Sequence, residues 1–172
     1  MKRPLIFALL CCLSSGAWPA SPGPRTHFQA LLYFTRHAEK LADDSRDPAL
    51  SEAGLRRAAA LAERLDGSGV TLIITTPFER TRSTAQLVAD RIGASLIEAP
   101  VDGGVEQHVQ AVVRLIADNP TQRILVVGHS NTLGPIIRGL DGPAIAPIAE
   151  DQYGDLYLLH VQDGLSRSHY GD

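Results

Sequence analysis

Hydrophobic positions along the chain follow two spacings, one typical of strands and one typical of helices. Short apolar runs rich in β-branched residues predict buried strands, and longer segments with apolar residues three or four positions apart predict helices. The two kinds of segment alternate as far as residue 140. The predicted strands are 30–34, 70–74, 95–97, 124–127, 156–161 and 165–170, and the predicted helices are 51–65, 80–92, 105–116 and 132–140.

This alternation predicts an α/β fold, a three-layer sandwich with a mostly parallel central sheet and helices on both faces. The last two predicted strands are joined at Asp163-Gly164, so we expect a C-terminal hairpin that adds an antiparallel edge to the sheet. A length of 172 residues with 44% hydrophobic content suffices for one domain with a substantial core. No repeat, low-complexity tract or second domain is visible in the sequence.

The N-terminus has the pattern of a secretory signal peptide. Lys2 and Arg3 precede an apolar run over 5–13, which is too short to span a bilayer, and small residues follow it. Cleavage is expected after Ala17 or after Ala20. The expected organisation is a signal peptide over 1–20, a flexible lead-in over 21–28 and one folded domain over 29–172, exported and periplasmic, with no stable membrane insertion once the signal is removed.

Cys11 and Cys12 are the only cysteines, and both lie inside the apolar run of the signal peptide. A lipid anchor on either one would need small residues immediately upstream, where Leu9 and Leu10 stand. The mature domain is therefore expected to contain neither disulfides nor thiolate chemistry.

Cationic groups and histidines follow the ends of the predicted strands. Arg36-His37 come after the first strand, Arg80 shortly after the second, Asp102 after the third and His129 after the fourth. Because ligands in such sheets bind beyond the carboxyl ends of the strands, these side chains are expected to meet at one rim. Arginine forks suit phosphate oxygens, and a neutral imidazole is a competent nucleophile toward phosphorus. The pattern predicts a phosphate site.

Other classes of function fit the sequence poorly. The net charge of -3 argues against a general nucleic-acid binder. The chain lacks a G-x-S-x-G elbow, a phosphate loop ending in Gly-Lys-Ser/Thr and an H-E-x-x-H pair. A zinc site on His37 and His129 is disfavoured by the flanking Arg36 and Arg80, so we expect neither metal nor cofactor. Taken singly, each residue also has a structural explanation, such as Ser130 capping the following helix.

Four ordered motifs resemble the histidine phosphatase superfamily, which includes the cofactor-dependent phosphoglycerate mutases. The family pattern begins with Arg-His-Gly or Arg-His-Ala, then Asp-x-x-Leu-Ser/Thr-x-x-Gly, Ser-Pro-Leu-x-Arg-Ala-x-x-Thr-Ala and Gly-His-Ser/Gly. The chain has 36-RHAE-39, 47-DPALSEAG-54, 76-TPFERTRSTA-85 and 128-GHSNT-132. It lacks the insertions of the longer mutases and is similar to the compact phosphatase branch, which includes phosphohistidine phosphatases and small exported members.

The resemblance implies a role for each matching position. His37 is similar to the nucleophile that becomes a phosphohistidine, Arg36 and Arg80 to the phosphate-binding arginines, and His129 to the second histidine, which stabilises the transferring group. We add Ser130 as a phosphate-binding residue, because the helix that follows it is expected to point backbone N–H groups at the same pocket.

The general acid is not identified by the motifs. Where family members carry a glutamate, this chain has Gly103-Gly104. Asp102 is our first candidate, because it directly follows the third predicted strand, and Glu106 is the second. Asp43 stands where many members have a phosphate-binding asparagine, so we do not predict a phosphate contact at this position.

The sequence therefore predicts a metal-independent phosphoric monoester hydrolase similar to the histidine acid phosphatases. It would hydrolyse a phosphomonoester or a phosphohistidine, on a small molecule or a phosphoprotein, through a covalent phosphohistidine on His37. Two alternatives remain: a phosphotransferase of the phosphoglycerate mutase type, which the short length disfavours, and a phosphate-binding protein with weak or no catalysis, which the uncertain acid keeps open.

Overall fold

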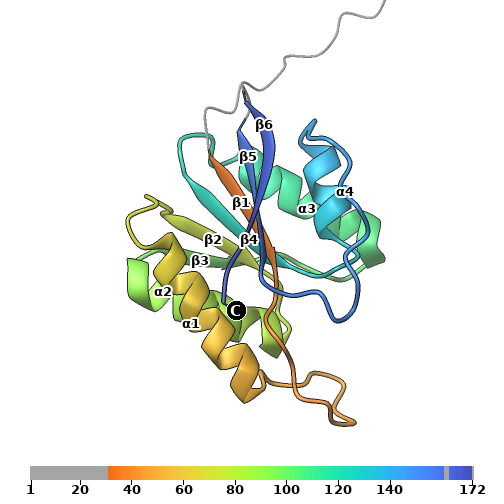
Figure 1. The fold of residues 1–172 in the computed structure, drawn as a ribbon. Coiled ribbons are helices and arrows are strands. Elements are labelled where there is room, and N and C mark those ends of the chain that lie inside the picture. The colour runs from red at the N-terminus through yellow and green to blue at the C-terminus, as the bar shows by residue number, and fades with distance from the viewer. Residues whose placement is uncertain (1–30, 161–162, 172) are drawn as a thin grey trace, which may run out of the picture.

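A six-stranded sheet lies between two pairs of helices in the computed structural model, which describes residues 31–160 and 163–171. Figure 1 shows α1 and α2 on one face of the sheet and α3 and α4 on the other. The elements are β1 (Leu32–Arg36), α1 (Glu52–Leu65), β2 (Leu72–Thr75), α2 (Glu79–Ile92), β3 (Ser95–Glu98), α3 (Gly104–Ala117), β4 (Ile124–Gly128), α4 (Leu133–Gly139), β5 (Asp155–His160) and β6 (Gly164–His169).

The strand order is β3-β2-β4-β1-β5-β6. The first four strands of this order are parallel, and β5 and β6 pair in the antiparallel sense at one edge. The predicted α/β sandwich with a terminal hairpin is therefore confirmed. Parallel strands all point the same way, so the carboxyl ends of β1, β2 and β4 meet at one rim of the sheet.

Alternating side chains of the central strand β4 enter two separate hydrophobic cores. Ile124 and Val126 pack with α3 and α4, whereas Leu125 and Val127 pack with α1 and α2. Successive residues of a strand point to opposite faces, so an uninterrupted apolar run is required where both faces are covered. The run over 124–127 was for this reason a strong strand signal in the sequence.

Element boundaries differ from the predicted ones by no more than two residues. The clearest difference is β1, which begins at Leu32 and includes Arg36, so the guanidinium group projects from the last residue of the strand rather than from the loop after it. Strand β1 extends to Arg36 because its parallel pairing with β4 continues to that residue, which lies opposite Gly128. The predicted end of the fifth strand at Val161 lies outside the described residues.

The second motif fixes the segment after β1 against α1. Ser51 caps α1, as predicted, by accepting a hydrogen bond from Gly54 N at 3.1 Å, and its own backbone N–H donates to Glu39 O at 2.9 Å. A Cβ atom at Gly54 would lie 2.0 Å from Glu39 O, so only glycine permits this approach. The glycine of this motif therefore holds the chain that follows His37.

Among the described residues, no helix is both long enough and apolar enough to cross a membrane. The signal peptide, the lead-in and the two cysteines fall outside those residues, so cleavage and periplasmic location stay predictions.

Candidate active site

The backbone of His37 is held by two neighbouring elements. Its N–H donates to Gly128 O at 3.0 Å, which extends the β1–β4 ladder by one residue. The next N–H, of Ala38, donates to Thr84 Oγ1 at 3.1 Å on helix α2. Both Ala38 and Thr84 are fully buried. The imidazole is therefore presented from a rigid strand end and not from a free loop.

The tautomer of His37 follows from a single contact. Its Nδ1 lies 2.7 Å from Ala38 O, and because a carbonyl only accepts, Nδ1 carries the proton and donates. The lone pair is then on Nε2. Burial lowers the pKa of His37 to about 4, with the charges of Arg36 and Arg80 acting in the same direction against the Ala38 hydrogen bond. The ring is neutral near pH 7, as a nitrogen nucleophile requires.

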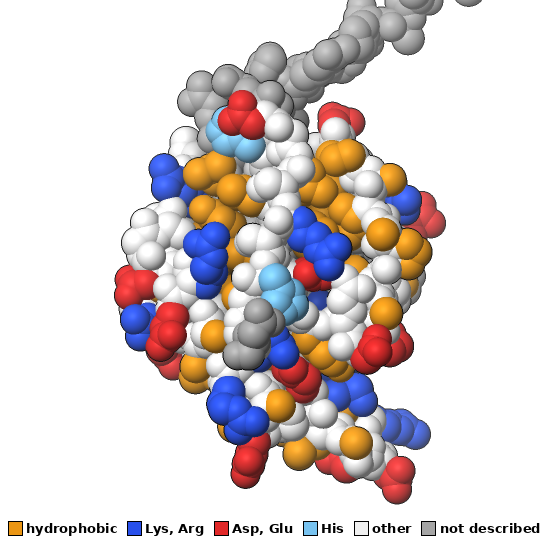
Figure 2. Space-filling model, in the orientation of Figure 1, with side chains coloured by type: hydrophobic (Ala, Val, Ile, Leu, Met, Phe, Trp, Pro, Cys, Tyr) orange, Lys and Arg blue, Asp and Glu red, His pale blue; other side chains and the backbone are white. Residues whose placement is uncertain are grey.

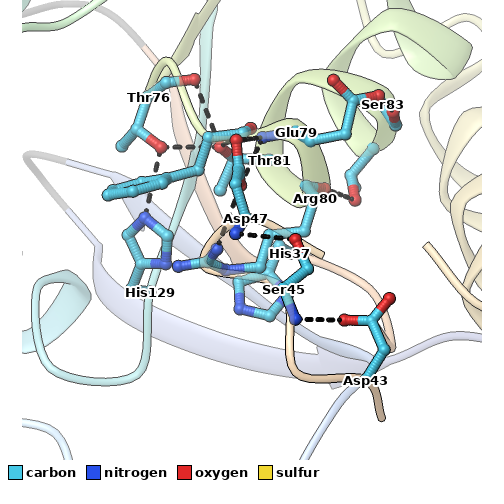
Figure 3. A network of polar contacts seen from close by, with 12 residues as sticks. His37, Asp43, Ser45, Asp47, Thr76, Glu79, Arg80, Thr81, Ser83 and His129 are labelled. Carbon is cyan, nitrogen blue, oxygen red and sulfur yellow. Dashed lines mark hydrogen bonds and ion pairs between the residues drawn. The ribbon is translucent and has the colours of Figure 1, made fainter. Parts of the chain in front are cut away.

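His129 faces His37 across the rim of the sheet. Their ring centroids are 5.4 Å apart with an interplanar angle of 64°, and His129 Nε2 lies 3.2 Å from Thr76 Oγ1. Burial, followed by the electrostatic interactions with His37 and Arg80, lowers the pKa of His129 to about 3. Figure 3 shows the two histidines and Arg80 converging from three separate segments of the chain.

The Arg80 side chain is oriented by an aromatic ring and by a carboxylate. Its guanidinium carbon lies 4.6 Å from the centre of the Phe78 ring, and its Nη1 atom lies 3.4 Å from Asp47 Oδ1. The Asp47 carboxylate also accepts the backbone N–H of Glu79 at 2.9 and 3.0 Å. It thus caps the first turn of α2, whose own N-cap residue Phe78 provides no side-chain hydrogen bond. The aspartate of the second motif therefore positions the arginine of the third (Figure 3).

Arg36 is bound by the segment that leads into β5. Its Nη1 donates to three backbone carbonyls, and its Nη2 lies 3.1 Å from a carboxylate oxygen of Glu150. The guanidinium carbon lies 4.3 Å from the centre of the Tyr153 ring. The buried Nε has no hydrogen-bond partner among the described residues, so Arg36 keeps a donor for a ligand. The carbonyls belong to Ala149, Glu150 and Gln152.

A cavity of about 510 Å³ opens at this rim and brings together the predicted phosphate-binding residues. Its lining combines cationic and polar side chains with the apolar side chains of Phe78, Val101 and Val105. The full lining is Arg36, His37, Lys40, Phe78, Arg80, Val101, Gly104, Val105, His108, His129, Ser130, Asn131, Thr132 and Glu150.

The two predicted acids do not line the cavity. Asp102 and Glu106 are exposed, in the turn before α3 and in its first turn. Three titratable groups that sequence reasoning missed do line it, namely Lys40, His108 and Glu150. Glu150 accepts a hydrogen bond from Ser130 Oγ at 3.1 Å, and His108 Nδ1 donates to Pro100 O at 2.8 Å. His108 lies one turn into the predicted helix 105–116, so the sequence could have placed it near the rim where that helix begins. No motif or periodicity in the sequence indicated that Glu150 lies at the site.

Basic side chains are not restricted to the cavity, since Arg56 and Arg167, for example, are exposed elsewhere on the surface. Figure 2 shows acidic and basic side chains interspersed on the face that carries the hairpin. In residues 31–160 and 163–171, no group of three or more histidine, cysteine or carboxylate side chains could hold a metal ion.

Comparison with known proteins gives matches to one family. A sequence model of the histidine phosphatase superfamily (branch 1) matches residues 32–101. A probable phosphoglycerate mutase, GpmB, from Yersinia pestis (strain Pestoides F) is 35% identical over 75 residues. That match covers 40% of this chain and only 35% of the relative, so the similarity spans about a third of the curated protein.

Solved structures extend the similarity of fold to most of the chain. The protein histidine phosphatase SixA complexed with tungstate is 18% identical with a TM-score of 0.59, and 83% of this chain covers 96% of it. A phosphoserine phosphatase from Entamoeba histolytica, in complex with 3-phosphoglyceric acid, is 16% identical with a TM-score of 0.55 over 83% of this chain and 97% of that one. The family match over residues 32–101 confirms the predicted resemblance to the histidine phosphatase superfamily, and the solved structures show the same fold over 83% of the chain.

Proposed function

We propose that this protein is a metal-independent phosphatase that forms a covalent phosphohistidine on His37. The observation that carries the proposal is the state of His37, whose Nδ1–H is bound to Ala38 O, so that an unprotonated Nε2 remains in a cavity lined by two arginines. A neutral, oriented nitrogen beside a cationic clamp is the arrangement that attack on a phosphoryl group needs.

The proposed reaction has two displacements at phosphorus. In the first, the Nε2 lone pair of His37 forms an N–P bond as the P–O bond to the leaving group breaks. Arg36, Arg80 and His129 bind the equatorial oxygens and stabilise their negative charge. In the second, water attacks phosphorus, the N–P bond breaks, and its electron pair returns to Nε2. Inorganic phosphate then leaves.

The arginines support a reaction without a metal ion. Arg36 is 5% exposed and the Arg80 side chain 16% exposed, so their charges act in a largely dry site. There they supply the positive charge that a divalent cation supplies in other phosphoryl-transfer sites. A bound cation would have to approach both guanidinium groups closely, which is electrostatically unfavourable.

The cavity supports a small phosphorylated molecule as the substrate. Besides the cationic groups, the lining includes the apolar side chains of Phe78, Val101 and Val105, which can contact a leaving group of modest size. The names of the structural neighbours support phosphohistidine or phosphoserine chemistry, and the GpmB relative supports phosphotransfer between hydroxyl groups as the second candidate. With the signal-peptide pattern, the proposed setting is the periplasm; a reporter fused to residues 1–28 would test export.

A phosphoester panel with and without EDTA tests the proposal. We expect release of free phosphate that EDTA does not reduce, and a phosphoryl label that is stable in base and labile in acid, on His37. Transfer of the label to a second substrate without free phosphate would favour the mutase. Tight phosphate binding without turnover of any ester would favour a binding protein.

A further inference from the structure

Glu150 is the only carboxylate among the described residues that line the cavity. One of its oxygens lies 3.1 Å from Arg36 Nη2, and the other accepts the Ser130 hydroxyl at 3.1 Å. The two partners of the ion pair differ sharply in exposure, because the Arg36 side chain is 5% exposed and the Glu150 side chain 85%. Only the two carboxylate oxygens of Glu150 are bound, and the rest of the side chain is in solvent. The side chain can therefore change its conformation without disturbing the fold.

We propose that Glu150 is the group that protonates the leaving oxygen and later deprotonates the attacking water. This inference rests on the proposed phosphatase function. Asp102 and Glu106 do not line the cavity, and His108 already donates through Nδ1. With the proton on Nδ1, the Nε2 atom of the neutral ring is an acceptor and has no proton to donate.

Arg36 couples the protonation of Glu150 to substrate binding. In the empty site, the carboxylate shares Nη2 of Arg36, while Nε is buried and without a partner among the described residues. A phosphoryl group bound to Nε and Nη2 would place a second anion beside the carboxylate. Like charges at short range favour the neutral form of one of them, so binding favours the protonated carboxyl that a proton donor requires.

Several other charged or polar groups line the same cavity or contact Arg36. The groups are Arg36 and His37 at the end of β1, Lys40 beyond them, Arg80 on α2, His129 and Ser130 after β4, His108 on α3, and Tyr153 on the same segment as Glu150.

The proton balance closes over the two steps. As His37 Nε2 bonds to phosphorus and the P–O bond breaks, the proton of the Glu150 carboxyl passes to the leaving oxygen. The resulting carboxylate then accepts a proton from water as the water oxygen attacks phosphorus and the N–P bond breaks. Glu150 is again protonated, as it was before the reaction.

A structural role for Glu150 can be separated from a chemical one. The segment stays attached to Arg36 through the backbone carbonyls of residues 149, 150 and 152, and a glutamine at 150 leaves these bonds unchanged. Glu150→Gln keeps the shape and a hydrogen-bond acceptor but removes the titratable proton. Asp151→Asn is the matched control, since Asp151 is the neighbouring exposed carboxylate and does not line the cavity.

The test compares glycerol phosphate with 4-nitrophenyl phosphate. An alkoxide needs a proton to leave, and nitrophenolate does not. We expect Glu150→Gln to lose roughly 10²-fold or more in kcat on the alkyl ester. With the nitrophenyl ester, it should release a burst of about one nitrophenolate per enzyme at the wild-type rate and then accumulate phosphohistidine, because water attack lacks its base. Asp151→Asn should match wild type in both assays.

Three outcomes would overturn the inference. The first is an unchanged Glu150→Gln variant, and the second is a burst slowed as much as the alkyl reaction, which would mean that the carboxylate only orients Arg36. The third is a loss in Asp151→Asn equal to that in Glu150→Gln. Failure of the proposed function is distinct from all three, because the wild-type protein would then form no phosphohistidine and hydrolyse neither ester.

Discussion

Replacement of His37 by asparagine should change how the stability of the protein depends on pH. Asparagine can still donate a hydrogen bond from its side-chain amide to Ala38 O, but it cannot take up a proton near neutral pH. The buried imidazole has a folded-state pKa of about 4, against an ordinary value of 6.5. Between those two values the unfolded chain binds a proton at this position and the folded chain does not.

The sign and size of the effect follow from linkage. Since the unfolded state binds more protons in that window, the free energy of unfolding falls as the pH is lowered from about 6.5 to about 4, and His37 contributes nothing further below that. The gap between the two pKa values corresponds to roughly 3 kcal/mol. That is a large share of the stability of a typical small domain.

Urea denaturation at several pH values between 7 and 4 would measure the effect. His129 acts in the same direction, toward its pKa of about 3, and is present in both proteins. Because burial, which the variant keeps, is the main cause of its lowered pKa, most of the difference between wild type and His37→Asn comes from His37. We expect the wild type to lose roughly 3 kcal/mol more than the variant over this range. Parallel stability profiles would refute the claim that His37 is a buried, neutral histidine.

Three further predictions concern the site. His37→Ala should lower turnover by several orders of magnitude and abolish the acid-labile phosphoryl label, with circular dichroism at pH 7 unchanged; a persistent label on another residue would move the nucleophile. Arg80→Ala and His129→Ala should each weaken vanadate binding by roughly 1.5–3 kcal/mol, measured by calorimetry, and wild-type affinity in both would contradict their contact with the anion. Asp47→Asn should weaken vanadate binding less than Arg80→Ala does and lower the thermal midpoint, because it perturbs both the Arg80 contact and the cap of α2.

Much of the fold and part of the candidate site could be predicted because their signals are local or periodic. A short apolar run rich in β-branched residues, such as 124–127, favours a strand covered on both faces, and the helix over 52–65 has its cap residue Ser51 beside it. Parallel strands bring their carboxyl ends to one rim, so His37 and His129 could be expected to meet without any knowledge of the loops between them. The roles of these residues in catalysis stay predictions.

Only the tertiary structure decided which carboxylate reaches the cavity and how the cations are held. Glu150 lies 114 residues from its partner Arg36, in a segment without regular structure, so neither spacing nor periodicity could connect them. Asp47 likewise reaches Arg80 across 33 residues through a loop. The proton on Nδ1 of His37 depends on one carbonyl that happens to lie within reach. Sequence patterns encode the sheet, and the geometry of the sheet fixes where the strand ends lie. Loop contacts depend instead on the packing of the whole domain, which no local sequence pattern encodes.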